Sequence, residues 1–182
     1  MSPPSDDVIR GEAVPGPAPP RRLCVAPMME CTDRHFRYLM RLISRRVYLY
    51  TEMVTAAALL FGDAERLLHF HPLEHPLALQ LGGDDPGQLA RAARLGVDRG
   101  YDEINLNVGC PSERVRAGRF GACLMLDPRR VADCVAAMAA AVDRPVTVKC
   151  RTGVDEADGE EELHAFIATV AAAGCGTFIV HA

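Results

Sequence analysis

The sequence from 105 to 112 contains the clearest candidate for a reactive thiol, Cys110. Gly109 allows the backbone to approach its neighbours closely and Pro111 stiffens the exit, so Cys110 is expected on a defined turn. A thiol there can act as a nucleophile or as a proton donor, and its reference pKa of about 8.5 keeps it mostly protonated at neutral pH. The other cysteines lie in strand or helix patterns typical of small buried side chains, apart from the intermediate case of Cys123.

Lys149 is the single lysine among 20 basic residues, and it lies at the end of an apolar segment. Its compact ammonium group can reach into a cavity that a planar guanidinium would not fit. Beside a carbonyl-rich cofactor it would stabilise negative charge, as an anionic reduced flavin requires. The alternative is that this lysine survives there by chance.

Polar side chains also end other apolar segments. Gln80 lies in one of them, and its buried amide must either satisfy neighbouring backbone or bind the edge of a flat heterocycle. His181 is comparable, although a lone histidine of this kind is more often a core residue. The full set that ends apolar segments is Met28, Met29, Glu30, Glu52, Gln80, Asn107, Lys149 and His181.

Two further groups of residues have weaker signals. His69, His71 and His75 cluster with Glu74, but Pro72 interrupts them and no ligand-bearing helix fits the spacing, so no metal site is predicted. Arginines recur at helical spacing in the first helix, where a solvated face is the usual interpretation, and again beside Cys110, where phosphate contacts are expected. The two sets are Arg34, Arg37, Arg41 and Arg45, and Arg114, Arg116 and Arg119.

Six short apolar segments must position these side chains, and they alternate with helical patterns. The predicted strands begin near residues 22, 47, 77, 103, 146 and 177, and the clearest helices cover 33–44, 86–99, 128–142 and 160–173, the first capped by Thr32 or Asp33. This alternation predicts a parallel sheet. No G-x-G-x-x-G follows the first strand, and polar residues end several strands, so a (β/α)₈ barrel is favoured over an open doubly wound sheet.

A closed barrel needs eight strands, whereas this sequence supplies about six. The expected fold class is therefore α/β, an incomplete (β/α)₈ TIM barrel over residues 22–182 that is truncated at its C-terminus. Residues 1–21 contain six prolines and few large apolar side chains, which predicts a disordered leader.

Composition excludes several protein classes. The 182 residues are 49% apolar and 24% charged, with a net charge of −4, so there is one globular core and no domain-wide basic field of a nucleic-acid-binding protein. Seven cysteines without a C-x-x-C pair, and no signal-peptide-like start, favour a cytoplasmic protein with reduced thiols. No apolar run is long enough to predict a membrane span.

From about residue 23 to 182 the chain resembles tRNA-dihydrouridine synthases, most closely their A-type branch. The segments that carry the resemblance are VAPMMECTDRHFR, LYTEMVT, ALQLGG, GYDEINLNVGCPSERV, GRFGACLM and VTVKCRTG. The resemblance implies an FMN-containing TIM barrel that reduces uridine to dihydrouridine in the D-loop of tRNA with NADPH, followed in that family by a helical tRNA-binding domain. The A-type branch suggests the region of positions 20 and 20a.

The resemblance also implies roles for single residues. Cys110 resembles the family's proton donor, and Asn107 resembles a residue that contacts the substrate tRNA. The residues that resemble its FMN contacts are Pro27, Met28 and Met29, through the backbone, and Gln80, Lys149 and His181, through their side chains. Hydride addition at C6 of uracil leaves an enolate that needs a proton at C5, and a thiol can deliver that proton.

Two alternatives stay open at this point. One is a flavin-free barrel enzyme that uses Cys110 as a covalent nucleophile. The other is an inactive truncated remnant. In TIM barrels the loops after the seventh and eighth strands usually bind phosphate, so we expect weak or no FMN retention by the 182-residue chain.

Overall fold

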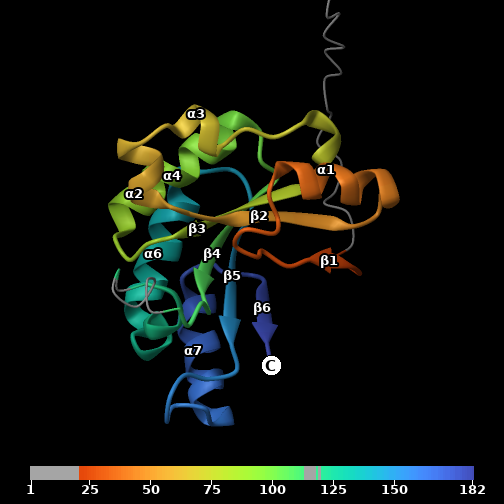
Figure 1. The fold of residues 1–182 in the computed structure, drawn as a ribbon. Helices are drawn as coiled ribbons and strands as arrows, with labels where there is room; N and C mark the ends of the chain where they lie inside the picture. The colour runs from red at the N-terminus through yellow and green to blue at the C-terminus, as the bar shows by residue number, and fades with distance from the viewer. Residues whose placement is uncertain (1–20, 113–117, 119) are drawn as a thin grey trace, which may run out of the picture.

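The computed structural model describes residues 21–112, 118 and 120–182, and these contain one sheet of six parallel strands. Each strand pairs with the next one along the chain, and the sheet curls so that its strands turn progressively across Figure 1. The predicted α/β class and the barrel with six of its eight strands are confirmed. The strands are β1 (Cys24–Val25), β2 (Tyr48–Thr55), β3 (Leu77–Gly82), β4 (Glu103–Val108), β5 (Val146–Arg151) and β6 (Phe178–His181).

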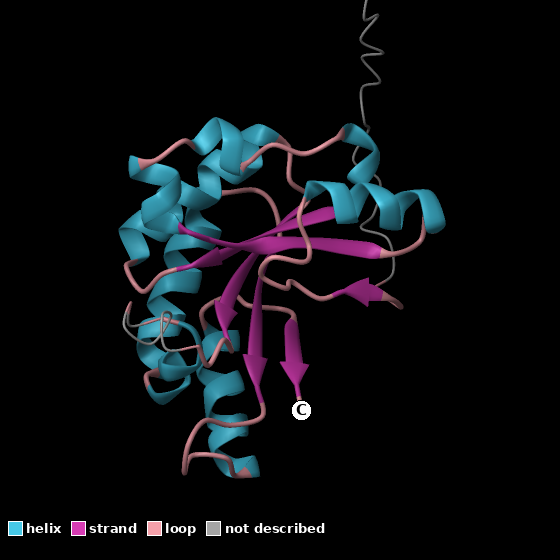
Figure 2. Ribbon diagram, viewed as in Figure 1, coloured by secondary structure: helices cyan, strands magenta, loops and turns pink. Residues whose placement is uncertain are grey.

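Helices cover the outer face of this curled sheet (Figure 2). The four helices expected from the sequence are present as α1 (Arg34–Ile43), α4 (Pro86–Arg99), α6 (Pro128–Ala141) and α7 (Glu160–Ala172), and Asp33 caps α1. Four short elements were not predicted, because six residues or fewer do not complete two turns of a periodic pattern. They are α2 (Ala56–Phe61), α3 (Ala64–Leu67) and the 3₁₀ helices η1 (Pro72–Glu74) and η2 (Gly121–Leu126).

The two faces of the sheet differ in chemistry. Leu79, Ile104 and Leu106 belong to the apolar core shared with the helices, and all three are fully buried. Because successive side chains of a strand point to opposite faces, the residues between them in β4 point to the barrel interior. Those inward-pointing residues are Glu103, Asn105 and Asn107, so the face of β4 that lines the barrel interior is entirely polar.

Helix α1 is packed with its charged face inward. Arg37 and Arg41 are 4% and 6% exposed, whereas Leu39 and Ile43 are 53% and 69% exposed. Arg37 donates through Nε to Glu74 Oε2 at 2.6 Å and through a terminal nitrogen to the Thr32 carbonyl at 2.7 Å. The expectation of a solvated arginine stripe is therefore wrong for Arg37 and Arg41.

The buried carboxylate of Glu74 explains this inversion. Glu74 is 0% exposed in η1, and Arg41 also donates to its backbone carbonyl at 2.9 Å. A buried carboxylate needs charge-paired and hydrogen-bonded partners. Arg37 supplies the counter-charge, and the backbone N–H of His71 donates to Glu74 Oε1 at 2.7 Å. The charge requirement of η1 therefore outweighs the apolar pattern of α1.

The start of the described chain is tied to the barrel. Arg21, which composition assigns to the leader, forms an ion pair with Glu103 and lies over the Tyr48 ring. Residues 1–20 of the predicted leader and the loop arginines Arg114, Arg116 and Arg119 lie outside the described residues. None of the described helices has the length and apolar character needed to cross a membrane.

Candidate active site

A cavity of about 1180 Å³ opens at the carboxyl ends of the strands. Side chains from the loop after β1 through to the end of β6 line it, so the curl of the sheet brings distant parts of the sequence to one place. Eight residues were expected to form the site: Cys110, Asn107 and the six expected FMN contacts. Seven of them line this cavity: Pro27, Met29, Gln80, Asn107, Cys110, Lys149 and His181.

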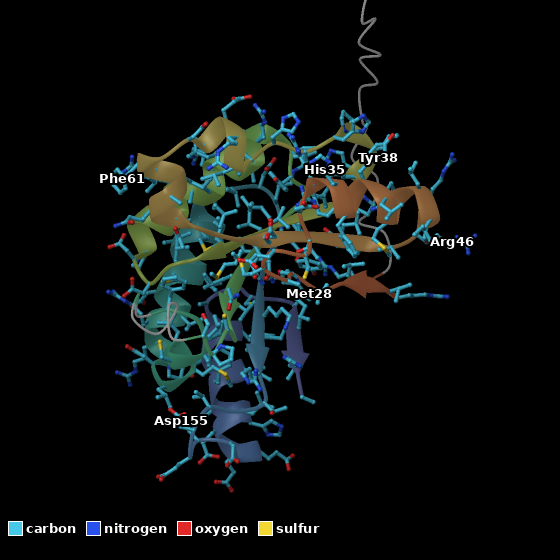
Figure 3. The ribbon with its side chains drawn as sticks, viewed as in Figure 1. Met28, His35, Tyr38, Arg46, Phe61 and Asp155 are labelled. Atoms are coloured by element: carbon cyan, nitrogen blue, oxygen red, sulfur yellow. The ribbon has the colours of Figure 1, made fainter. Side chains whose placement is uncertain are left out.

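Met28 is the exception, and it belongs to the loop that supports its two neighbours. Its backbone N–H donates to Thr32 Oγ1 at 3.0 Å, and its carbonyl accepts from the Thr32 hydroxyl at 3.1 Å. Figure 3 labels Met28 on this loop between β1 and α1. Glu30 has a positive φ of 60°, and its N–H donates to Glu52 Oε1 at 2.5 Å. These bonds fix the backbone where Pro27 and Met29 line the cavity.

The turn that carries Cys110 is held by Asn107. The Asn107 Oδ1 atom accepts the backbone N–H groups of Gly109 and Cys110, each at 3.0 Å. A Cβ atom on Gly109 would lie 3.2 Å from the carbonyl carbon of Cys150 in the neighbouring strand. The expected close backbone approach at this glycine is therefore present, and it fixes the turn against β5.

The cysteines differ sharply in their surroundings. Burial raises the pKa of Cys134 to about 12 and that of Cys150 to about 11, so both thiols stay protonated and inert. Cys24 and Cys31 are exposed, which contradicts the burial expected from their patterns. Cys110 is partly exposed, and it is the cysteine that lines the cavity.

Lys149 brings a positive charge into the same cavity. Burial lowers its pKa from the ordinary value, because desolvation disfavours the charged form. Among residues 21–112, 118 and 120–182, nothing forms a hydrogen bond or an ion pair with its ammonium group. The cavity therefore contains a cation that a bound anionic group could pair with.

The side-chain amide of Gln80 is 1% exposed and bonds to other side chains rather than to backbone. Its Nε2 donates to Asn105 Oδ1 at 2.8 Å, and its Oε1 accepts from Asn107 Nδ2 at 3.0 Å. Asn105 was not predicted to belong to the site. The alternation of polar and apolar residues in Glu-Ile-Asn-Leu-Asn-Val was the signal that could have found it.

Basic residues after β1 and β2 extend the lining of the cavity. They come from the start of α1 and from the region of α3, which sequence analysis could not place beside Cys110 without the fold. Positive charge at the mouth of a site suits contacts to a phosphate backbone. These residues are Arg34, His35, Arg66 and His69.

The histidine cluster has structural partners. The His71 side chain caps η1 by accepting the Leu73 N–H at 3.1 Å, and His75 Nδ1 lies 2.7 Å from Asp102 Oδ2. Glu74 is paired with Arg37. Within the described part of the chain, no three histidine, cysteine or acidic side chains are grouped as metal ligands.

Comparison with known proteins agrees with this arrangement. The family model described as "Dihydrouridine synthase (Dus)" matches residues 24–182. Proteins named tRNA-dihydrouridine(20/20a) synthase are similar over most of the chain. One from Synechocystis is 62% identical over 160 residues, covering 88% of this chain and 48% of its own length. One from Shewanella oneidensis is 59% identical over 162 residues, covering 89% and 48%.

A third such protein, from Pseudomonas putida, is 58% identical over 166 residues, covering 91% of this chain and 49% of the relative. The chain thus spans about half the length of the curated relatives it matches. The match contains β1 to β6, the turn that carries Cys110 and the rest of the cavity. The chain belongs to the dihydrouridine synthase family.

Proposed function

We propose that this chain forms the flavin-binding and thiol-bearing part of an enzyme that reduces uridine to 5,6-dihydrouridine in the D-loop of tRNA, in the cytoplasm, with NADPH as the reductant. The observation that carries the proposal is one cavity lined by the Cys110 thiol, the Lys149 ammonium group and the Gln80 and Asn107 amides. The names of the similar proteins support tRNA as the substrate and positions 20 and 20a as its site.

The donors of the cavity fit FMN. Its flat ring system carries carbonyl oxygens and ring nitrogens, and the cavity offers hydrogen-bond donors from Gln80 and Lys149. We assign FMN contacts to those two side chains, to His181 and to the backbone of Pro27, Met28 and Met29. When bound, reduced flavin supplies the hydride that adds to C6 of uracil. Lys149 would stabilise the negative charge on the cofactor ring.

Cys110 completes the reduction with a proton. The C5–C6 bond of uracil is conjugated with the C4 carbonyl, so addition of hydride at C6 leaves an enolate that must be protonated at C5. The Cys110 thiol gives this proton and becomes a thiolate, which solvent then reprotonates. Asn107 contacts the target base, which must leave its stack in the RNA to enter the cavity.

The structure favours this role of Cys110 over nucleophilic catalysis. A nucleophilic thiol is usually activated by an adjacent base. The Cys110 Sγ atom lies 3.5 Å from the Ser112 hydroxyl, and within the described residues neither His181 nor Lys149 forms a hydrogen bond with it. A thiol with neither of these bases bonded to it suits a proton donor better than an activated nucleophile. The third possibility, an inactive remnant, differs from the proton-donor and nucleophile roles because it predicts neither flavin binding nor turnover.

We propose that the FMN-binding barrel domain covers residues 22–182 and that residues 1–21 precede it as a leader, with Arg21 at the boundary because its side chain contacts Glu103. Contacts to tRNA phosphates are assigned to the basic rim at Arg34 and Arg66, which line the cavity mouth.

Expression of the protein from its gene in a bacterial strain that lacks dihydrouridine at positions 20 and 20a tests the proposed function. Dihydrouridine should reappear at one or both positions, as measured by mass spectrometry of the isolated tRNA. The purified product of the whole gene should show a flavin spectrum that NADPH bleaches. A colourless protein with thiol-dependent chemistry on other substrates would support the nucleophile alternative. A folded protein with neither flavin nor turnover would support the remnant.

Replacing Lys149 by methionine should weaken FMN binding by about 10- to 100-fold, because one charge-assisted hydrogen bond is lost. Binding is measured by fluorescence titration of added FMN. Arg45→Met, which removes one exposed positive charge outside the cavity, is the matched control. Since burial lowers the pKa of Lys149, its charge is lost as pH rises through that lowered value, so FMN affinity should also fall at alkaline pH. Equal affinity of the two variants would refute the role of Lys149.

A further inference from the structure

A continuous line of hydrogen bonds runs through the polar interior of the barrel. Glu103 Oε1 accepts the Thr147 hydroxyl at 2.5 Å, and Thr147 Oγ1 accepts from Asn105 Nδ2 at 2.8 Å. Asn105 Oδ1 accepts from Gln80 Nε2 at 2.8 Å, and Gln80 Oε1 accepts from Asn107 Nδ2 at 3.0 Å. Four hydrogen bonds therefore connect the first residue of β4 to the residue that holds the Cys110 turn.

Both ends of this line impose the same direction on it. The backbone N–H groups of Gly109 and Cys110 can only donate, so Asn107 must present its Oδ1 atom to them and its Nδ2 atom to Gln80. At the other end, Glu103 is ion-paired with Arg21, and an ionised carboxylate can only accept. Every amide between the two ends is thereby restricted to one orientation.

Burial makes that orientation energetically significant. Glu103 and Asn105 are 0% exposed, and Gln80 and Thr147 are 1% exposed, so water does not compete for these bonds. Inverting one amide would place oxygen against oxygen and nitrogen against nitrogen in a setting where an unsatisfied polar group is costly. The line is therefore expected to behave as one unit.

The fixed direction determines what the cavity offers to a ligand. Gln80 and Asn107 each use one N–H of the side-chain amide within the line, which leaves the second N–H of each amide. Both residues line the cavity that Lys149 also lines. This part of the wall consequently offers hydrogen-bond donors and suits ligand edges that carry acceptors.

We propose that Glu103, Thr147 and Asn105 are positioning residues for the site. They fix the amide orientations of Gln80 and Asn107, and through Asn107 they hold the turn that presents Cys110. Naming the acceptor edge as that of a flavin or a uracil rests on the proposed function, whereas the fixed orientation rests on the geometry alone.

Thr147→Val tests the proposal, because valine keeps the branched shape and removes the hydroxyl link. The backbone amide hydrogens of Gly109 and Cys110 should exchange with solvent about tenfold faster, measured by NMR on the protein expressed from its gene, without flavin or tRNA. Thr147→Ser keeps the hydroxyl and should restore slow exchange. A merely structural role would give the opposite order, since valine fills the site better than serine.

Tyr50→Phe is the matched control. The Tyr50 hydroxyl donates to the same Glu103 Oε1 atom at 3.2 Å but lies outside the line, so its loss should leave exchange at Gly109 and Cys110 unchanged. Unchanged exchange in Thr147→Val, or failure of Thr147→Ser to restore slow exchange, would overturn the proposal.

A measurement on the unaltered protein covers the case in which Thr147→Val does not fold. One side-chain N–H of Asn105 and one of Gln80 should exchange slowly, because each donates within the buried line. Exchange of both at the rate of free amides would overturn the proposal. Neither measurement depends on catalysis. Failure of the proposed function would therefore not change the exchange rates expected here, and failure of the exchange experiment would not refute the proposed function.

Discussion

Replacing Cys110 by alanine is expected to lower the rate of dihydrouridine formation by about 10²- to 10⁴-fold, the usual range for a lost general acid. The substitution removes the proposed proton donor for C5 of uracil, and it leaves the backbone bonds from Gly109 and Cys110 to Asn107 in place. Flavin content and its reduction by NADPH should stay close to those of the unaltered protein. The rate is measured in single turnover with reduced protein and tRNA that lacks dihydrouridine, by mass spectrometry.

Cys123→Ala is the matched control for this experiment. Cys123 is also a partly exposed thiol, but its Sγ atom donates to the Phe120 carbonyl at 3.2 Å and it does not line the cavity. Its replacement should change the rate by less than about threefold. If Cys110→Ala formed dihydrouridine as fast as Cys123→Ala, another group would have to supply the proton.

The position of the site could be predicted from the sequence, because parallel strands place their carboxyl ends at one edge. Gln80, Asn107 and Lys149 lie in the carboxyl-terminal halves of three successive strands, so a pattern of polar residues late in apolar segments was enough to bring them together. The partners of Gln80 were not predictable in the same way. Its hydrogen bonds depend on the register of β3 against β4, where Gln80 lies opposite Asn105.

The length of the first strand shows a limit of pattern analysis. The apolar segment from residue 22 predicts a strand that extends to Met28, but β1 consists of Cys24 and Val25 alone. Pro27 has no N–H to donate to a neighbouring strand, and Met28 forms its hydrogen bonds with Thr32. Local hydrogen bonds of the loop therefore replace the strand where Pro27 and Met29 line the cavity.

The packing of α1 could not be predicted for a physical reason. A helix with apolar residues at three- and four-residue spacing normally buries them. In this protein the buried carboxylate of Glu74, more than thirty residues later in the chain, requires Arg37 to face inward. Hydrophobic periodicity carries no information about such a long-range charge requirement, so Leu39 and Ile43 are exposed against the pattern.

Replacing Glu74 by alanine should lower the free energy of unfolding by about 3–5 kcal/mol, because the position that Arg37 occupies in the fold is buried and would lack its counter-charge. Urea unfolding followed by circular dichroism measures the loss. Glu65→Ala is the matched control, since Glu65 pairs with Arg99 at 2.6 Å but its side chain is 77% exposed. An exposed pair contributes less than about 1 kcal/mol, so the control should unfold close to the unaltered protein.

Glu74→Ala should also weaken FMN binding at the candidate active site. Arg37 bonds both Glu74 and the Thr32 carbonyl, and Thr32 in turn binds the backbone of Met28. Without Glu74, the guanidinium gains by moving toward solvent, which would release the loop that carries Pro27 and Met29. FMN affinity should therefore fall in Glu74→Ala even under conditions where the protein remains folded. A loss of stability below about 1 kcal/mol, with unchanged FMN affinity, would show that the inward arginine does not depend on Glu74.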